Sequence, residues 1–320
     1  MTEIVLVAEE IERNRDKMNM RPALEFIEQN APQYQANVDR FLGGEGYKKS
    51  RELADSIDFF NLPEDGVMQI TPELVRRIIS HVSPELTKLS KLKKVDYTWH
   101  NKVAVPNFGP DGNLNKDSAC IGVLGIEEFL ASKHHKERML IGNTAHTGDV
   151  VRMTAVPPTV SSDPKAIELY QTHVFLHEFF HTIECPVRSE EASSRILLNK
   201  SGRTFADWSR DYLESLNDEP ELTTQYAEGY ADRIFDGQRH IQNGVTPYDA
   251  SVREDMAEAW VASHFDIISN LSQPEPYRSF AAHSFGNPKS AGLLRDHSVA
   301  SRKALLMREL REAHITCIPE

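Results

Sequence analysis

Apolar residues recur at three- and four-residue intervals in the first part of the chain, and this spacing predicts helices. Pro72 after Thr71 is typical of a helix start. We therefore expect residues 1–90 to form an N-terminal helical region. The predicted helical segments are Ile4–Met18, Arg21–Phe41 and Thr71–Val82, separated by Pro, Gly and Asn.

Between residues 95 and 156 the pattern changes to short apolar runs, which are typical of β-strands. From Asp163 onward it is helical again, ending with an amphipathic stretch around Ala300–Ala313. This order predicts a mostly helical α+β protein with a small mixed sheet. Residues 91–320 would form the second region, with a soft boundary because no linker is evident. The predicted strands are Val95–Val105, Arg138–Ile141 and Val150–Val156.

Composition narrows the class of protein. The 320 residues, 40% hydrophobic and 26% charged, suit a soluble globular protein with a substantial core. A net charge of −12, with no basic cluster beyond Lys88–Lys94, argues against a nucleic-acid partner or an anionic membrane surface. No apolar run approaches the roughly 18 residues of a membrane-spanning helix, so we expect no membrane insertion.

The N-terminus and the cysteines bear on location. The first residues lack the basic start and apolar core of a secretory signal. Cys120, Cys185 and Cys317 are widely spaced and form neither a disulfide framework nor a CxxC motif. We expect a cytoplasmic protein, or one secreted by a route that needs no signal peptide.

One predicted helix carries metal-site spacing, the sequence His177-Glu178-Phe-Phe-His181. Asp163 is its candidate cap, Pro164 its first residue, and Pro186 ends it. Helical residues four apart lie about 40° apart and one turn along the axis, so both imidazoles could bind one zinc ion. Glu178 lies about 100° round from His177 and could act as the general base towards a zinc-activated water.

The surroundings of this motif favour a buried metal helix. No Lys or Arg lies between Lys165 and Arg188, which is typical of a central buried helix. The stripe formed by His173, His177, His181 and Glu184 would be costly to bury without a partner, and a metal is the simplest one. The alternative is a set of histidines hydrogen-bonded in an ordinary core. His173 suits a supporting role better than that of a ligand.

A zinc site with two histidines needs a third protein ligand. On a helix Glu254, Glu258, Val261 and Phe265 share one face. Glu254 as ligand, with Glu258 accepting a hydrogen bond from a ligand histidine, would satisfy both carboxylates.

Two alternatives compete with Glu254. Ser251-x-x-Glu254 is also a capping box, which would leave Glu254 at a helix start without a metal role. Glu228, in the segment Tyr226–Asp232, is the alternative third ligand, although nearby Glu221 and Gln225 give that face a solvated character.

Together HEFFH, Tyr248 and Glu254-Asp-Met-Ala-Glu258 resemble the gluzincin metallopeptidases, especially those similar to the anthrax lethal factor catalytic domain. The resemblance covers two stretches, Thr172–Ile183 and Pro247–His264. It implies a zincin-like fold, one catalytic zinc ion on His177, His181 and Glu254, Glu178 as base, and Tyr248 as donor to the transition state.

Two features qualify this resemblance. Tyr248 after Pro247 is also typical of a half-buried turn aromatic. The gap of 73 residues (254 − 181) departs from the family pattern and contains Glu228-Gly-Tyr-Ala-Asp232, which is similar to the corresponding helix of other gluzincins.

The implied activity is that of a zinc metalloendopeptidase acting on a peptide or protein. The alternatives are a zinc hydrolase for a non-peptide small molecule and a non-catalytic zincin-fold binding or effector protein. Val150–Val156 is the candidate edge strand for a bound peptide, with a plain core strand as the alternative. Neither the cleavage specificity nor the oligomeric state follows from the sequence.

Overall fold

The computed structural model describes residues 35–62, 70–99, 102–106, 120–125, 142–145, 147–154, 164–198, 202–218, 233–237, 240–265 and 302–317. The predicted helix Ile4–Met18, most of Arg21–Phe41 and the predicted strand Arg138–Ile141 lie outside these residues. Asp163 and Glu228 also lie outside them.

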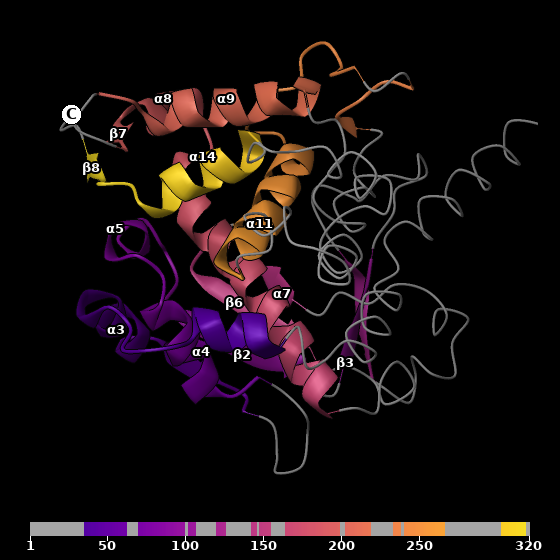
Figure 1. Ribbon diagram of the computed structural model, residues 1–320. Helices are drawn as coiled ribbons and strands as arrows, with labels where there is room; N and C mark the ends of the chain where they lie inside the picture. The colour runs from indigo at the N-terminus through magenta and orange to yellow at the C-terminus, as the bar shows by residue number, and fades with distance from the viewer. Residues whose placement is uncertain are drawn as a thin grey trace, which may run out of the picture.

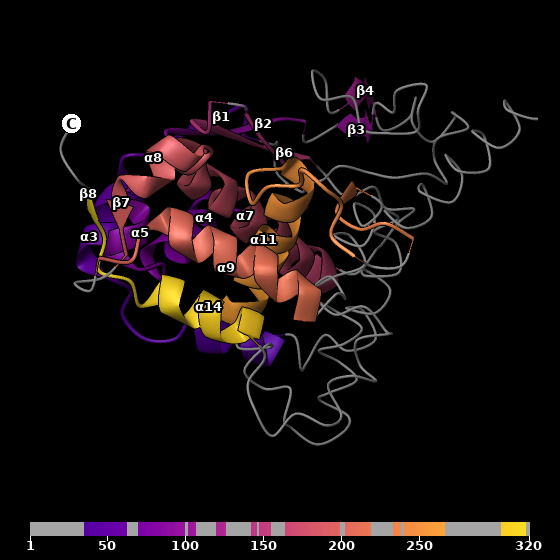
Figure 2. The ribbon, with the colours of Figure 1, turned by 90° about the horizontal axis from the view of Figure 1, so that it is seen from above.

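Helices dominate the described part of the chain (Figure 1). A small sheet lies on one side of them (Figure 2). A 3₁₀ turn, η2, covers Cys185–Val187. The predicted helices Thr71–Val82 and Ala300–Ala313 are confirmed as α4 and α14. The α-helices are α3 (Lys48–Asp55), α4 (Pro72–Ser80), α5 (Pro84–Thr87), α7 (Pro164–Glu184), α8 (Glu190–Ser194), α9 (Phe205–Asp218), α11 (Ala250–His264) and α14 (Arg302–Arg311).

Four strands form the main sheet in the order β1-β2-β6-β5. The first three are parallel and β5 is antiparallel to β6, so the predicted mixed sheet is confirmed. The predicted strand Val95–Val105 divides into β2 and β3, which belong to different sheets. The strands are β1 (Asp58–Phe60), β2 (Lys94–Trp99), β3 (Lys102–Pro106), β4 (Cys120–Gly125), β5 (Gly142–Thr144), β6 (Val150–Thr154), β7 (Ile196–Leu197) and β8 (Thr316–Cys317).

Strand β6 is an interior strand, so the prediction that Val150–Val156 forms the edge is wrong. Val150 pairs with Lys94 on one side, and Val151 pairs with Thr144 on the other. The side chains of Val151 and Met153 are fully buried, as expected of a core strand. Among the described strands, β5 lies at the end of the sheet.

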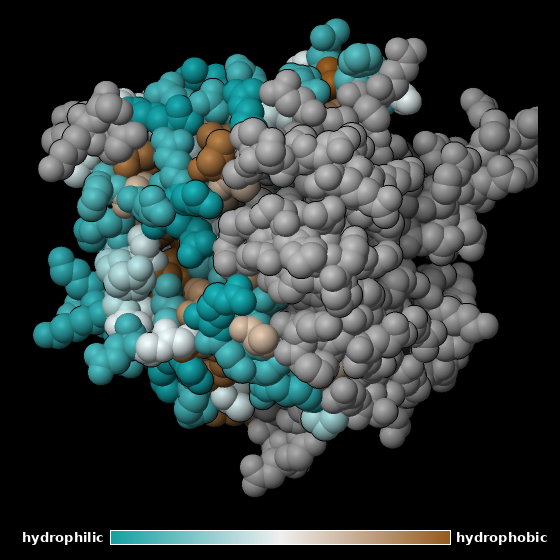
Figure 3. Space-filling view, viewed as in Figure 1, coloured by the Kyte–Doolittle hydropathy of each residue, from teal (hydrophilic) through white to brown (hydrophobic). Residues whose placement is uncertain are grey.

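The elements form layers, with α7 and α11 between the sheet and the α9–α14 pair (Figure 2). Helix α7 packs on β5 and β6 and on α11, and α14 packs on α11 and α9. The surface in Figure 3 is mainly hydrophilic where it is described, with hydrophobic residues in small separate patches. Among the described residues, the buried apolar side chains form one core cluster shared by the helices and the sheet.

Local sequence explains where two key helices begin and end. Thr71 caps α4 by accepting a hydrogen bond from the Leu74 backbone amide, and Pro72 is the first helical residue. Helix α7 begins at Pro164 and gives way at Cys185 to the 3₁₀ turn that contains Pro186. All of α7 from Leu169 to Glu184 is buried, which confirms the central buried helix predicted from its lack of Lys and Arg.

The described architecture is a mostly helical α+β fold, as predicted. The boundary near residue 90 and the cellular location stay predictions. Within the described residues, no helix has the length and apolar character needed to cross a membrane.

Candidate metal centre

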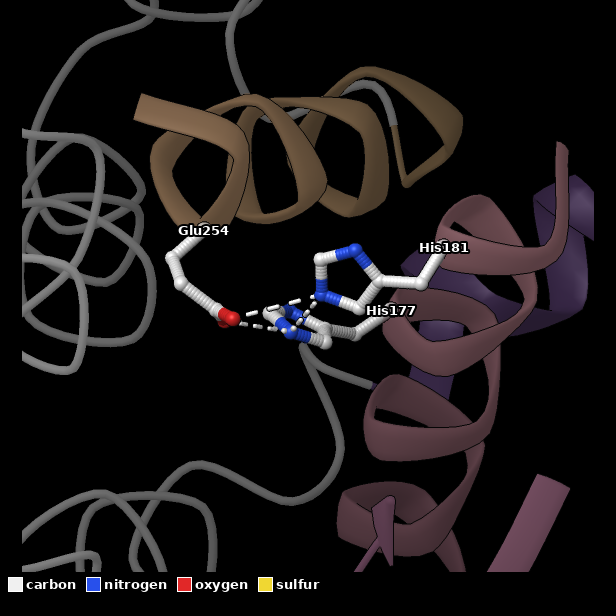
Figure 4. Close-up of side chains that lie close together, drawn as sticks. All are labelled: His177, His181 and Glu254. Atoms are coloured by element: carbon white, nitrogen blue, oxygen red, sulfur yellow. Dashed lines mark hydrogen bonds and ion pairs between the residues drawn. The ribbon is translucent and has the colours of Figure 1, made fainter. Parts of the chain in front are cut away.

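Helices α7 and α11 bring three potential metal ligands together. His177 and His181 lie on consecutive turns of α7, and Glu254 lies in the second turn of α11. Figure 4 shows both imidazoles and the carboxylate directed into the space between the helices. One ligand atom from each residue lies within 4.8 Å of the others. These three residues, here called the triad, could hold a metal ion.

The spacing within the triad suits zinc. Two nitrogens bound tetrahedrally at about 2.0–2.1 Å from zinc lie about 3.3–3.4 Å apart. The Nε2 atoms of His177 and His181 are 3.2 Å apart. Glu254 Oε2 lies 3.1 Å from His177 Nε2 and 3.6 Å from His181 Nε2. A donor set of two imidazoles and one carboxylate also matches the ligands that catalytic zinc takes.

Each imidazole is oriented by a carboxylate on its other nitrogen. Glu258 Oε1 lies 2.6 Å from His177 Nδ1, and Glu184 Oε1 lies 3.1 Å from His181 Nδ1. A hydrogen bond from Nδ1 to a carboxylate leaves Nε2 available as a ligand and fixes the ring plane. His173 also contacts Glu258, with 3.3 Å between its Nε2 and Oε1.

Two arginines hold Glu184 in place. Arg253 Nη1 donates to Glu184 Oε1 at 2.8 Å and Arg188 Nη2 donates to it at 2.9 Å. Arg253 belongs to α11 and directly precedes Glu254, so this ion pair joins the two helices beside the triad. Glu184 is among the ionisable residues singled out on the predicted helix. Its partner Arg253 lies 69 residues away in the sequence, so no local pattern could predict this ion pair.

The imidazoles and carboxylates of the centre shift one another's pKa values towards the charged forms. Burial works against a charged His177, but its hydrogen bonds to Glu254 and Glu258 outweigh burial and raise its pKa well above the ordinary value. Burial also opposes a charged His181, yet Glu254 and Glu184 raise its pKa to about 9. Burial opposes ionisation of Glu254 and Glu258 too, but the nearby imidazoles hold both pKa values far below the ordinary range. Without a metal, the centre is thus a set of imidazolium–carboxylate pairs.

Glu178 is fixed by a strand of the sheet. The Thr144 hydroxyl, at the end of β5, lies 2.7 Å from Glu178 Oε2 and 2.8 Å from the Glu178 carbonyl oxygen. The Glu178 side chain is buried next to His177. Thr144 is a site residue that sequence reasoning missed, because 34 residues separate it from Glu178.

The capping-box interpretation of Glu254 is wrong. Helix α11 begins at Ala250 with Asp249 as its N-cap, and Ser251 lies inside the helix, where it is buried. The Asp249 carboxylate instead accepts hydrogen bonds from the backbone amide and hydroxyl of Thr246. Because the helix starts earlier than the box requires, Glu254 lies in its second turn and its carboxylate is directed at the histidines.

The Tyr248 hydroxyl has other partners in this structure. It donates to Glu190 Oε2 at 2.8 Å and lies 2.7 Å from Ser193 Oγ. Partial burial, reinforced by Glu190, raises its pKa to about 12, so it is a neutral donor at physiological pH. Its predicted contact with a transition state stays a prediction.

A second buried charge cluster lies on another face of α11. Asp255 is fully buried and accepts hydrogen bonds from Lys303 Nζ at 3.0 Å and from the Tyr212 hydroxyl at 2.8 Å. Lys303 belongs to α14 and Tyr212 to α9, so Asp255 ties α11 to both helices.

No protein-family model, curated protein or solved structure matches the chain. The geometry defines a protein with a possible metal site on His177, His181 and Glu254 in a mostly helical α+β fold.

Proposed function

We propose that the protein is a zinc-dependent endopeptidase with a zincin-like, gluzincin-type site. The observation that carries this proposal is the buried triad, in which a separate carboxylate orients each imidazole. The peptide bond is proposed as the bond that is hydrolysed because the two motifs resemble those of gluzincins. The proposed substrate is a peptide or protein. The protein would cleave it in the cytoplasm, or outside the cell after export without a signal peptide.

The chemistry assigns a role to each group. Zinc, when held by the triad, supplies a Lewis acid that polarises a carbonyl and makes water more acidic. Glu178 takes a proton from the attacking water and gives it to the leaving amine as the C–N bond breaks. Glu258 and Glu184 hold the rings, and Thr144 fixes the Glu178 carboxylate.

Strand β5 is the proposed place for an extended substrate. It ends the described sheet, and its last residue, Thr144, contacts Glu178. A peptide added beside β5 would form backbone hydrogen bonds with the strand and pass close to the proposed base. Tyr248 could donate to an oxyanion there only after its hydroxyl leaves Glu190 and Ser193.

The decisive variant is Glu178→Gln. It removes the base and keeps the triad, so it should bind zinc in the same stoichiometry and lose about 10²–10⁴-fold in the rate of peptide hydrolysis. Elemental analysis measures the zinc content, and digestion of a peptide library measures the rate of hydrolysis. Glu191→Gln is the matched control, because Glu191 is an exposed glutamate paired with Arg195.

Three results would contradict the proposal. A wild-type protein that takes up no zinc would remove the metal site. Zinc binding with cleavage of esters or other small molecules but of no peptide would replace the peptidase with another hydrolase. Full peptidase activity in Glu178→Gln would end the base assignment.

A further inference from the structure

A cavity lies at the opposite end of α11 from the triad. Its volume is about 330 Å³, within the usual size range of small-molecule sites. The last turn of α11 borders it at His264, and α14 borders it at Arg308. Glu254 and His264 are ten residues apart, or about 15 Å along a helix, so this cavity is separate from the triad.

The cavity carries a positive charge in an acidic protein. Arg308 and Arg311 are three residues apart on α14 and line the same cavity. Arg311 donates to the carbonyl of Ser263, at the end of α11. Within the described part of the chain, no ion pair or side-chain hydrogen bond of Arg308 is present. Among the described residues that line the cavity, Glu312 is the one acidic residue, so the two arginines give this lining an excess positive charge.

The remaining lining combines hydrogen-bond donors with apolar surface. Tyr47 and Ser83 contribute hydroxyl groups, and the exposed aromatic ring of Tyr47 contributes apolar surface. Leu86 and Ala304 also line the cavity but are buried. Burial, together with Arg311, lowers the pKa of His264 well below its ordinary value, so this ring is neutral and adds no charge.

The number of donors distinguishes among anions. A carboxylate has two oxygens, which a single guanidinium already engages in a bidentate pair. A phosphate has three terminal oxygens and can accept from two guanidiniums and a hydroxyl together. The apolar lining would contact the organic part of a phosphate ester, which free phosphate lacks.

We propose that this cavity binds a small phosphate monoester, with Arg308 and Arg311 on the phosphate group and the exposed Tyr47 ring against the organic part. Arg308 is the principal recognition residue because Arg311 is already bound to Ser263. The proposal does not depend on zinc or on peptidase activity.

Isothermal titration with phenyl phosphate and with inorganic phosphate tests the proposal on the full chain. Wild-type protein should bind phenyl phosphate saturably and inorganic phosphate more weakly. Arg308→Gln should weaken phenyl phosphate binding about tenfold or more, since a hydrogen bond to a charged group contributes about 1.5–3 kcal/mol. Arg51→Gln is the matched control, because Arg51 is an exposed arginine on α3 outside the cavity.

Glu312→Gln gives an effect of opposite sign. It removes the opposing carboxylate and should strengthen binding. A parallel titration after chelation of zinc separates this cavity from the triad, because phosphate also coordinates zinc. The proposal is overturned if no saturable binding occurs, if Arg308→Gln and Arg51→Gln behave alike, or if chelation abolishes binding.

Discussion

Helix α11 carries buried and partly buried carboxylates in two different settings. Glu254 and Glu258 face the histidines of α7, whereas Asp255 faces Lys303 and Tyr212. Asp255 therefore has a lysine from the chain itself as its partner, and lysine has a much higher ordinary pKa than imidazole. Imidazoles are cationic only when protonated, so the carboxylates of the triad side depend on protons or on a metal. Burial of an acid is therefore a poor sign of function, and the nature of its partner is a better one.

The Asp255 cluster should be important for stability and unimportant for zinc. Lys303→Met leaves a buried carboxylate without its cation and should lower the free energy of unfolding by about 3–5 kcal/mol. Denaturant unfolding measures the loss. The double variant Lys303→Met/Asp255→Leu removes both charges and should recover much of it. A double variant as unstable as the single one would contradict this account.

The triad should be important for zinc binding and less important for the stability of the zinc-free protein. Glu254→Gln removes a charged ligand and should weaken zinc binding by more than about 100-fold, beyond the usual cost of losing a supporting residue. The free energy of unfolding of the zinc-free protein should fall much less than in Lys303→Met. Competition with a chelator measures the affinity, with Glu191→Gln as control. Unchanged affinity would exclude Glu254 as the third ligand and reopen Glu228.

Sequence periodicity accounts for much of this contrast. The shared faces of His177 and His181 and of Glu254 and Glu258 follow from 3.6 residues per turn. The buried character of α7 follows from the absence of Lys and Arg between Lys165 and Arg188. Pairings across the fold do not follow from periodicity. Thr144 meets Glu178, Arg253 meets Glu184 and Lys303 meets Asp255 only because strand order and helix packing bring distant segments together.

The wrong prediction that Val150–Val156 forms an edge strand also arises because the position of a strand depends on segments distant in the sequence. Residues Val150–Val156 have the apolar pattern of a strand, but whether a strand is central or at an edge depends on its neighbours. Strand β5, which covers the far side of β6, has only three residues and gives little local signal.

A smaller effect on zinc should come from Glu258. Glu258→Gln removes the carboxylate on His177 Nδ1 and should weaken zinc binding about 10–100-fold. Asp255→Asn, only three residues away on a different face of the helix, should change zinc affinity much less while lowering stability. Equal losses of affinity in the two variants would show that the clusters act as one unit.

The zinc-free protein should also show a pH dependence of its stability. The folded-state pKa of His181 is raised to about 9, so its pairing with Glu254 and Glu184 stabilises the fold fully below the ordinary pKa of about 6.5. That contribution is lost as the pH rises from about 6.5 through about 9. Denaturant unfolding of the zinc-free protein across this pH range should show the decline in the free energy of unfolding. The Lys303→Met variant should show the same decline with pH. A flat profile would contradict the imidazolium pairing.

The separation of the triad along the chain has a consequence for biosynthesis. Glu254 follows His181 by 73 residues (254 − 181). At about 5–20 residues per second, a ribosome makes that stretch in roughly 4–15 s. During this interval the nascent chain displays the two histidines without Glu254, Glu258 or Arg253. Metal loading is therefore expected to follow the emergence and docking of α11, late in translation or after release.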